Sequence, residues 1–343
     1  MFWLGLIVSL AYVPGYTGAF IPTQWVVLSC LLPLALWREG RMTPLHWLGA
    51  TFLAYAFASY FWSVDQYDAV WGLWLLSIVA LAFWLGSTQA NLRQLYIGLA
   101  IGLTVSSIVA VLQFYGIRPV LGGTGIRSSG LLFSPVALGS SCALVLVGLA
   151  SERLWWLIPG LVPGLALSQS RGAIAVTVLG LVAVFFRRPH ILLLIALAFA
   201  LVATSIPFES DFIRVQIWRV AFNDLTLFGH GPGSFLNVLF LTNKSLVHPE
   251  YVHNDLLQLG YEYGGASLLV FAIGAVALSR TDALDWPVLV AFCALGLFSF
   301  PLYTPIPAFL GACVAGRLAR EWDSCRSRSV LWRPVPIQRG EIG

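Results

Sequence analysis

The sequence predicts an all-α, polytopic integral membrane protein with about twelve transmembrane helices. Of its 343 residues, 59% are hydrophobic and only 10% are charged, and the mean hydropathy is +0.84. An ordinary soluble domain is about 45–50% apolar and about 25% charged, so this composition excludes a soluble globule. Apolar runs recur from one end of the chain to the other, which indicates that lipid surrounds most of the protein.

The helices follow from the apolar runs, taken in order along the chain. Several runs are shorter than the about 20 residues that cross a bilayer, so they must borrow loop residues, tilt little or pack among their neighbours. The first run, Met1 to Val13, lacks the basic start and the small-residue cleavage site of a signal peptide, so we expect it to be retained. The expected helices cover residues 1–13, 25–37, 45–62, 69–86, 95–116, 131–150, 154–168, 173–186, 190–207, 255–279, 286–300 and 305–319.

The orientation follows from arginine and lysine, because short cytoplasmic loops accumulate them. With the N-terminus inside, thirteen of the 19 cations fall on the cytoplasmic face. Both termini are therefore predicted to be cytoplasmic, with 1–320 as the membrane domain and 321–343 as a basic tail. Six cations remain on the outer face: Arg118, Arg127, Arg171, Arg214, Arg219 and Lys244.

One loop, residues 208–252 between the ninth and tenth expected helices, is much longer than the others. It is too short for a separate domain, and a loop longer than about 15 residues is usually functional. Amphipathic pieces at 211–222 and 234–241 predict two short helices within it. We therefore expect the functional site on the outer face.

Five of the six outer cations are arginines, although the preference of arginine and lysine for cytoplasmic loops disfavours them on the outer face. Arg171 follows Ser170 between two apolar helices, and Arg214 stands one turn before Trp218 on the same helical face. A guanidinium is always charged and matches two phosphate oxygens at once, which predicts a phosphate or diphosphate ligand. Alternatively, Arg171 reaches to the interface, and Arg214 and Arg219 pair with acidic residues of the loop; for Arg219 this is the better interpretation.

His253, where the long loop re-enters the membrane, is the candidate base. Imidazole changes charge near neutral pH and can take a proton from a hydroxyl. The alternative is a polar helix entrance, with Asn254 as the N-cap and Asp255 favoured by the helix dipole. Glu262 lies nine residues beyond His253, on the opposite side of one continuous helix. We therefore favour a structural or orienting role for Glu262 over direct chemistry, with a partner such as Arg171, Arg127 or a neighbouring helix.

Two further motifs have simpler explanations. The glycine-rich turn at 229–235 offers backbone donors for an anion, but it has no Walker-type lysine, so a tight turn is the better interpretation. Asp65 and Asp68 could supply a carboxylate base, against the simpler interpretation of a solvated loop. The five cysteines and the other candidate ligands lack metal-site spacing, so neither a metal nor a cofactor is expected.

The order of these motifs resembles the O-antigen ligase family, whose superfamily includes O-antigen polymerases and bacterial O-linked oligosaccharyltransferases. The resemblance spans about residues 63–265 and rests on Ser170-Arg171-Gly172, Arg214 to Trp218, the turn 228–235, and His253-Asn254 followed by Glu262-Tyr263-Gly264. It implies metal-independent, inverting transfer of a glycan from an undecaprenyl diphosphate carrier to an acceptor, at the periplasmic face of the bacterial inner membrane. The 208–252 loop is then periplasmic.

The resemblance also implies roles for individual residues. Arg171 and Arg214 would hold the diphosphate, and His253 would activate the acceptor hydroxyl. The resemblance and the polar residues expected at the outer face together predict further substrate contacts: Arg127, Arg219, Trp218, Asn254 and Glu262. The partners are the lipid-linked donor, an acceptor that is lipid A core, another glycan or a protein, and membrane lipid, but not nucleic acid.

Two other functions stay open at this point. In a flippase or exporter the same arginines would line a path rather than a pocket, although no inverted repeat is seen and the polar residues gather on one face. In a transferase that uses single prenyl-phosphate sugars, Asp65 would be the base. Comparison of Asp65→Asn with His253→Ala in one transfer assay separates this transferase from one that uses a diphosphate carrier and His253.

Overall fold

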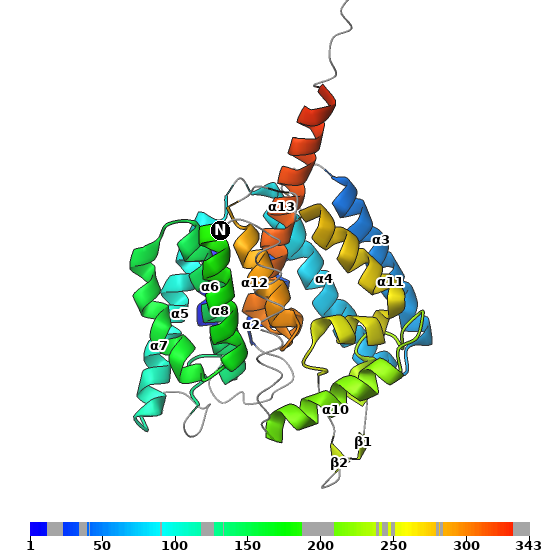
Figure 1. Ribbon diagram of the computed structural model, residues 1–343, viewed down its shortest axis with the longest axis horizontal. Helices are drawn as coiled ribbons and strands as arrows, with labels where there is room; N and C mark the ends of the chain where they lie inside the picture. Colours follow the sequence, from blue (N-terminus) through cyan, green and yellow to red (C-terminus); the bar gives the residue numbers. More distant parts are fainter. Residues whose placement is uncertain are drawn as a thin grey trace, which may run out of the picture.

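A computed structural model shows a bundle of helices (Figure 1). The structure describes residues 1–11, 23–33, 40, 42–89, 91–117, 127–132, 134–186, 209–237, 240–241, 246–247, 251–278, 281 and 284–331. The expected helix at 190–207 lies outside these residues. Elsewhere in the described ranges, each expected membrane helix coincides with an α-helix, so the all-α prediction is confirmed.

The α-helices have the following bounds: α1 Phe2–Leu10, α2 Thr23–Leu31, α3 Pro44–Ser59, α4 Gln66–Thr88, α5 Arg93–Phe114, α6 Pro135–Ser151, α7 Ile158–Ser168, α8 Arg171–Phe186, α10 Glu209–Asn223, α11 Asp255–Leu278, α12 Trp286–Gly296 and α13 Pro305–Leu331. The 3₁₀ turns between them include η2 Tyr60–Trp62, η3 Trp155–Leu157, η4 Ser234–Asn237 and η5 Pro301–Tyr303. Helix α13 continues to Leu331, so the expected tail from residue 321 begins as helix.

The expected helix at 234–241 is wrong. Only Ser234–Asn237 forms a helical turn, of the 3₁₀ type, and Phe240–Leu241 (β1) pairs antiparallel with Leu246–Val247 (β2). The pairing of a hairpin satisfies backbone groups that a short isolated helix would leave to water. These two strands of two residues each are the only strands among the described residues.

The helix starts follow from capping residues in the sequence. Ser134 precedes α6, and its hydroxyl accepts a hydrogen bond from the backbone N–H of Ala137 at 3.1 Å. Thr43 precedes α3 and forms a capping box with His46, and a proline follows at the first helical position. These local signals explain why the expected boundaries at 45 and 131 lie within a few residues of the observed ones.

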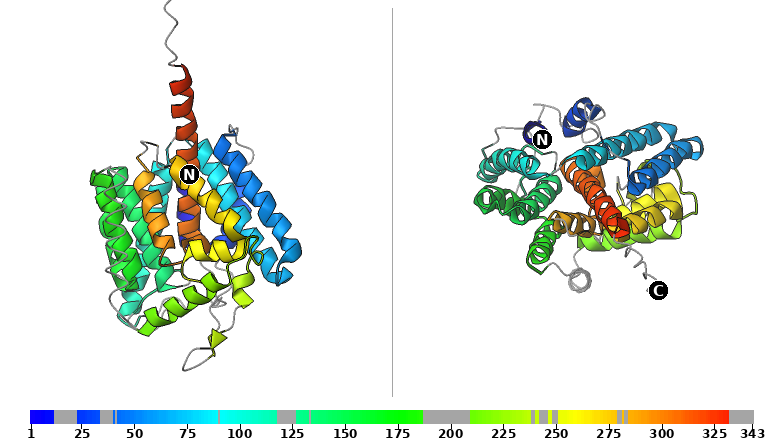
Figure 2. Two further views of the ribbon diagram at one scale, coloured as in Figure 1. Left: turned by 45° about the vertical axis from the view of Figure 1, so that its right-hand side comes forward. Right: turned by 90° about the horizontal axis from the view of Figure 1, so that it is seen from above.

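Helix α13 lies near the centre of the bundle and packs along α4 (Figure 2). Glycines permit this close approach, because a Cβ at Gly86 would overlap the backbone of Cys313, and one at Gly316 would overlap the carbonyl of Phe83. Small residues at helix contacts are typical of membrane bundles. Helix α10 crosses one end of the bundle, opposite the end from which α13 projects (Figures 1 and 2).

Two of the described helices, α4 and α5, are long and apolar enough to cross a membrane, judged by length and composition. The shorter apolar helices are Pro135–Ser151, Trp155–Ser168, Arg171–Phe185, Ser267–Ala277 and Trp286–Gly296. By helix length and composition, the described residues indicate an association with a membrane.

Helix α11 is broken, so the expected continuous helix at 255–279 is wrong at one point. Gly264 has φ 72° and ψ −170°, a conformation that is available to glycine almost alone. A Cβ there would overlap the carbonyl oxygen of Leu227, and the next N–H, of Gly265, donates to that oxygen at 3.1 Å. The break lets the turn at 227–233 pack directly against the α11 backbone.

We expect Gly264→Ala to destabilise the protein by about 1–3 kcal/mol from the backbone conformation alone, with the overlap adding to this. Gly274→Ala is the matched control in the same helix, because a Cβ there meets nothing within 4 Å. Alanine should there stabilise the helix by about 0.5–1 kcal/mol. Unfolding in detergent, followed by circular dichroism, compares the two. Equal stabilities would contradict the assigned role of Gly264.

Candidate functional site

Helix α10 is anchored to the entrance of α11. The indole Nε1 of Trp218 donates to the carbonyl oxygen of Val252 at 3.0 Å. A small hydrophobic cluster holds the same contact: Ile217, Ala221, Phe235, Val252 and Tyr261. Helix α10 is therefore bound to the residue that directly precedes His253.

His253 has a left-handed backbone with φ 57°, which is uncommon outside glycine. Its half-buried ring meets the ring of Phe300 edge to face, with 5.1 Å between the centroids. Burial, and then the positive charge of Arg214, lower the pKa of His253 to about 4. The imidazole is therefore neutral near pH 7 and able to accept a proton.

Aromatic rings support the segment that carries His253. Tyr251 stacks on Phe300, with 4.7 Å between centroids and 14° between planes, and it also lies 5.1 Å from the ring of Tyr303. Offset stacking of this kind adds to the energy of simple burial. Tyr251, Phe300 and Tyr303 form an aromatic platform under the α11 entrance.

A chain of hydrogen bonds leads from Val252 to Glu262. The backbone N–H of Val252 donates to Oε1 of Gln258 at 3.1 Å, and Nε2 of Gln258 donates to Oε1 of Glu262 at 3.0 Å. The hydroxyl of Tyr303 donates to Oε2 of Glu262 at 3.0 Å, and the backbone N–H of Gly233 also donates to this carboxyl group. We call Gln258, Glu262 and Tyr303 the carboxyl network.

The observed position of Glu262 corrects two expectations. Its partners are Gln258, Tyr303 and Gly233, not an arginine, and His253 precedes α11 instead of sharing one continuous helix with Glu262. Glu262 is fully buried, and both of its carboxyl oxygens accept bonds from the protein. This geometry fits an orienting role better than a substrate contact.

Asn254 and Asp255 build the helix start. Oδ1 of Asn254 accepts from the backbone N–H of Leu257 at 3.1 Å, so the interpretation of Asn254 as an N-cap is confirmed. Oδ2 of the buried Asp255 accepts from the N–H of Leu302 at 3.0 Å. The start of α11 is thereby tied to the turn that precedes α13.

The glycine-rich turn is a tight turn, as the simpler interpretation of the sequence has it. The N–H of His230 donates to the carbonyl of Tyr261 at 3.0 Å, and the N–H of Gly231 donates to the carbonyl of Glu262 at 2.9 Å. Glycines 229, 231 and 233 all have positive φ, between 68° and 94°. These donors are used to dock the turn onto α11, so they are not open to an anion.

A second group of cations lies at the α7–α8 turn. Nε of Arg127 donates to the carbonyl of Ser168 at 3.2 Å, and Arg171 is the exposed first residue of α8. This turn is built on different helices from the α10–α11 group, which contains Arg214, Trp218 and His253. Arg219 lies on α10 and is exposed.

Asp65 has a structural role at the start of α4. Its Oδ1 accepts from the backbone N–H groups of Tyr67 at 2.7 Å and Asp68 at 3.3 Å. A carboxylate in this N-cap position satisfies helix donors and is stabilised by the helix dipole. The geometry therefore supports the helix start rather than a catalytic base.

Sequence reasoning missed the groups that hold His253. Gln258 could have been found, because it lies one helical turn before Glu262 and so shares its face. Phe300 and Tyr303 could not, because they come from a distant 3₁₀ turn that only the fold brings to His253.

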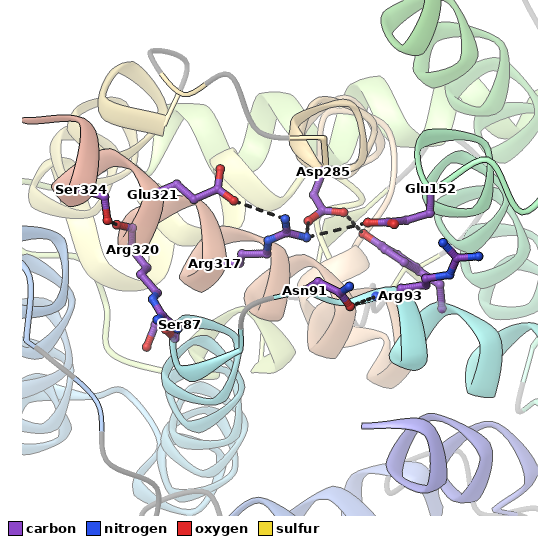
Figure 3. A network of polar contacts seen from close by, with 10 residues as sticks. Ser87, Asn91, Arg93, Glu152, Asp285, Arg317, Arg320, Glu321 and Ser324 are labelled. Carbon is purple, nitrogen blue, oxygen red and sulfur yellow. Dashed lines mark hydrogen bonds and ion pairs between the residues drawn. The ribbon is translucent and has the colours of Figure 1, made fainter. Parts of the chain in front are cut away.

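Another polar cluster, drawn in Figure 3, lies toward the end of the bundle from which α13 projects in Figure 1. The buried Arg317 forms ion pairs with Asp285, with Glu152 at 3.8 Å and with Glu321 at 3.2 Å. The hydroxyl of Tyr96 donates to Oδ1 of Asp285 at 3.0 Å. The sequence assigned Arg317 to topology alone, whereas the structure uses it to join α13 to the start of α12 and the end of α6.

The fold and the site define a class: an all-α protein that has, among its described residues, two helices able to span a membrane and, at one end of its bundle, a histidine whose pKa is lowered by burial and by Arg214. No model of a known protein family matches the chain, and no curated protein matches it.

Proposed function

We propose that this protein is a polytopic glycosyltransferase of the O-antigen ligase type in the bacterial inner membrane. It moves a glycan from an undecaprenyl diphosphate carrier to an acceptor hydroxyl. The proposal includes the arrangement of about twelve transmembrane helices, cytoplasmic termini and a periplasmic site. Its support is the composition, the order of the motifs and the geometry around His253.

One observation carries the proposal: a neutral imidazole and a guanidinium act on each other at the entrance of α11. Arg214 is near enough for its charge to lower the pKa of His253, and Trp218, one turn further along α10, is bonded to the residue before it. A base next to an anion-binding group is what transfer from a diphosphate to an alcohol requires.

The chemistry needs cations and a base. The acceptor oxygen attacks the anomeric carbon, its proton passes to the imidazole of His253, and the bond from that carbon to the diphosphate breaks. The leaving diphosphate gains charge, which Arg214 and Arg171 neutralise. Two unit charges about 4 Å apart attract by roughly 4 kcal/mol at an effective dielectric of about 20, before desolvation is subtracted. Direct displacement inverts the anomeric centre.

A reconstituted assay tests this function. The purified protein in proteoliposomes receives a defined undecaprenyl diphosphate glycan, with lipid A core, a second carrier-linked glycan or an acceptor protein in separate reactions. We expect transfer to one of the three, with inverted configuration in the product. An isolated glycosyl-enzyme intermediate, or release of diphosphate with no acceptor used, would contradict the mechanism.

The pH dependence of turnover follows from the pKa of His253. The base acts in its neutral form, which exists above a pKa of about 4, whereas an ordinary histidine becomes neutral only above about 6.5. We therefore expect kcat/KM to stay level from pH 7 down to about pH 5 and to fall tenfold per pH unit below about pH 4. Initial rates measured across this range check the prediction. A fall of kcat/KM that begins near pH 6.5, which we call the acid limb, would contradict it.

A further inference from the structure

The residue before His253, Val252, is held by hydrogen bonds to both its backbone carbonyl and its backbone N–H. The carbonyl of Val252 accepts from Trp218, and its N–H donates to Gln258. His253 itself has a left-handed backbone, which is unfavourable for a residue with a Cβ and persists only when its surroundings enforce it. The bonds at Val252 are therefore the direct restraint on the direction of the imidazole.

The amide of Gln258 holds Val252 only in one orientation. If the amide turned over, its NH₂ group would face the N–H of Val252, and that bond would be lost. Glu262 prevents this, because its Oε1 accepts from Nε2 of Gln258 at 3.0 Å. Tyr303 in turn holds Oε2 of Glu262 at 3.0 Å.

The network closes on itself. The ring of Tyr303 packs against Tyr251, the residue before Val252, with 5.1 Å between centroids. The path from Tyr251 through Tyr303, Glu262 and Gln258 thus returns to Val252 without leaving buried or half-buried side chains. A closed, fully bonded network of this kind is rigid and sensitive to the loss of any member.

We infer that Gln258, Glu262 and Tyr303 are positioning residues that hold His253 in its reactive direction. The inference rests on the proposed function for its consequence in catalysis, and on the geometry alone for its effect on His253. The network members act through Val252 and are assigned no contact with the reacting atoms. Loss of the network should lower kcat while leaving donor binding in place.

The chain offers a matched control for Tyr303. Tyr303→Phe and Tyr96→Phe each remove one phenolic hydroxyl that donates to a buried carboxylate at 3.0 Å, the first to Glu262 and the second to Asp285 at the opposite end of the bundle. Both should lower the melting temperature. Only Tyr303→Phe should lower kcat, by about tenfold, because displacement of a reacting group by about 1 Å can cost up to about 10²-fold.

The conservative variant separates positioning from direct chemistry. Glu262→Ala should lower kcat by about 10- to 10²-fold with KM for the donor little changed. Glu262→Gln should recover most of this loss, because its amide oxygen can accept from Gln258 and its NH₂ group can donate to the oxygen of Tyr303. A carboxylate that exchanged protons with the substrate would not be replaced by an amide.

A second measurement needs neither donor nor acceptor. Carbethoxylation of His253 by diethyl pyrocarbonate, followed across pH by peptide mass spectrometry, reports the neutral fraction and the exposure of this imidazole. In Glu262→Ala and Tyr303→Phe, the pH midpoint of His253 carbethoxylation should move from a pKa of about 4 toward the ordinary value near 6.5. The rate of carbethoxylation should rise. In Tyr96→Phe the midpoint should stay in place.

The outcomes are distinguishable. If His253 is needed for transfer but its reactivity and kcat are unchanged in Glu262→Ala and Tyr303→Phe, the positioning inference is overturned and the proposed function stands. If no transfer is found but the midpoint moves in these variants alone, the positioning of His253 stands and the proposed function falls. Should Glu262→Ala not fold, Tyr303→Phe decides by the same two measurements.

Discussion

His253→Ala should lower kcat by about 10²- to 10⁴-fold, the range that a positioned general base contributes. His253 is neutral near pH 7 because burial and Arg214 lower its pKa to about 4, so it can take the proton of the acceptor hydroxyl. The same change should leave the dissociation constant for the undecaprenyl diphosphate donor nearly unchanged, since the arginines remain. Turnover in proteoliposomes and donor binding by the detergent-solubilised protein measure the two quantities.

A second histidine controls for this variant. His230 lies in the glycine-rich turn, where its ring packs 4.4 Å from the ring of Tyr261 and its Nε2 is 2.8 Å from the carbonyl oxygen of Asp224. His230→Gln removes an imidazole at the same end of the molecule and leaves the hydrogen bonds of Val252 to Trp218 and Gln258 in place. It should keep most of the turnover, and wild-type turnover in His253→Ala would remove the general base from the mechanism.

Arg214→Lys and Arg171→Lys should each lower kcat/KM by about 10- to 10²-fold, because one hydrogen bond to a charged group is worth about 1.5–3 kcal/mol. Lysine keeps the charge but cannot make two parallel bonds to a phosphate from a planar group. Loss of activity with retained charge would therefore identify two-pronged recognition. Initial rates at several donor concentrations give the ratio.

Arg93→Lys is the control for the arginines. Arg93 is exposed at the first position of α5, at the end of the bundle away from α10, and it is assigned no role in the site. Neutral replacements of the two arginines should also differ in a useful way. Because the charge of Arg214 lowers the pKa of His253, Arg214→Gln should move the acid limb of the rate profile to higher pH, whereas Arg171→Gln should leave the limb in place. Near wild-type kcat/KM in both lysine variants would refute the two-pronged binding of the diphosphate by Arg171 and Arg214.

Much of the site could be predicted from local sequence. The spacing of Arg214 and Trp218 places both on one face of α10, and Trp218 meets the segment that carries His253. Asn254 as an N-cap and the glycine turn as a tight turn also follow from residue preferences that act over a few positions. These features depend on local backbone chemistry, which a sequence states directly.

The partners of Glu262 depended on contacts between distant segments. An apolar run predicts that a buried carboxylate needs a donor, but it does not say which segment supplies it. Here Tyr303, from the turn before α13, supplies one. Gly264 gives a similar lesson, because a glycine in a helical pattern is compatible with a straight helix, and the backbone break appears only when Leu227 packs against it.

The sequence by itself determined the helical class, the helix starts and the residue types available at the α10 end of the bundle, since these depend on hydropathy, capping and charge along the chain. Only the tertiary structure decided which side chains meet: Trp218 with Val252, Gln258 and Tyr303 with Glu262, and Arg317 with Asp285 at the far end. The physical reason is that a buried polar group must find a partner through space, and that partner is selected by helix packing rather than by proximity in the chain.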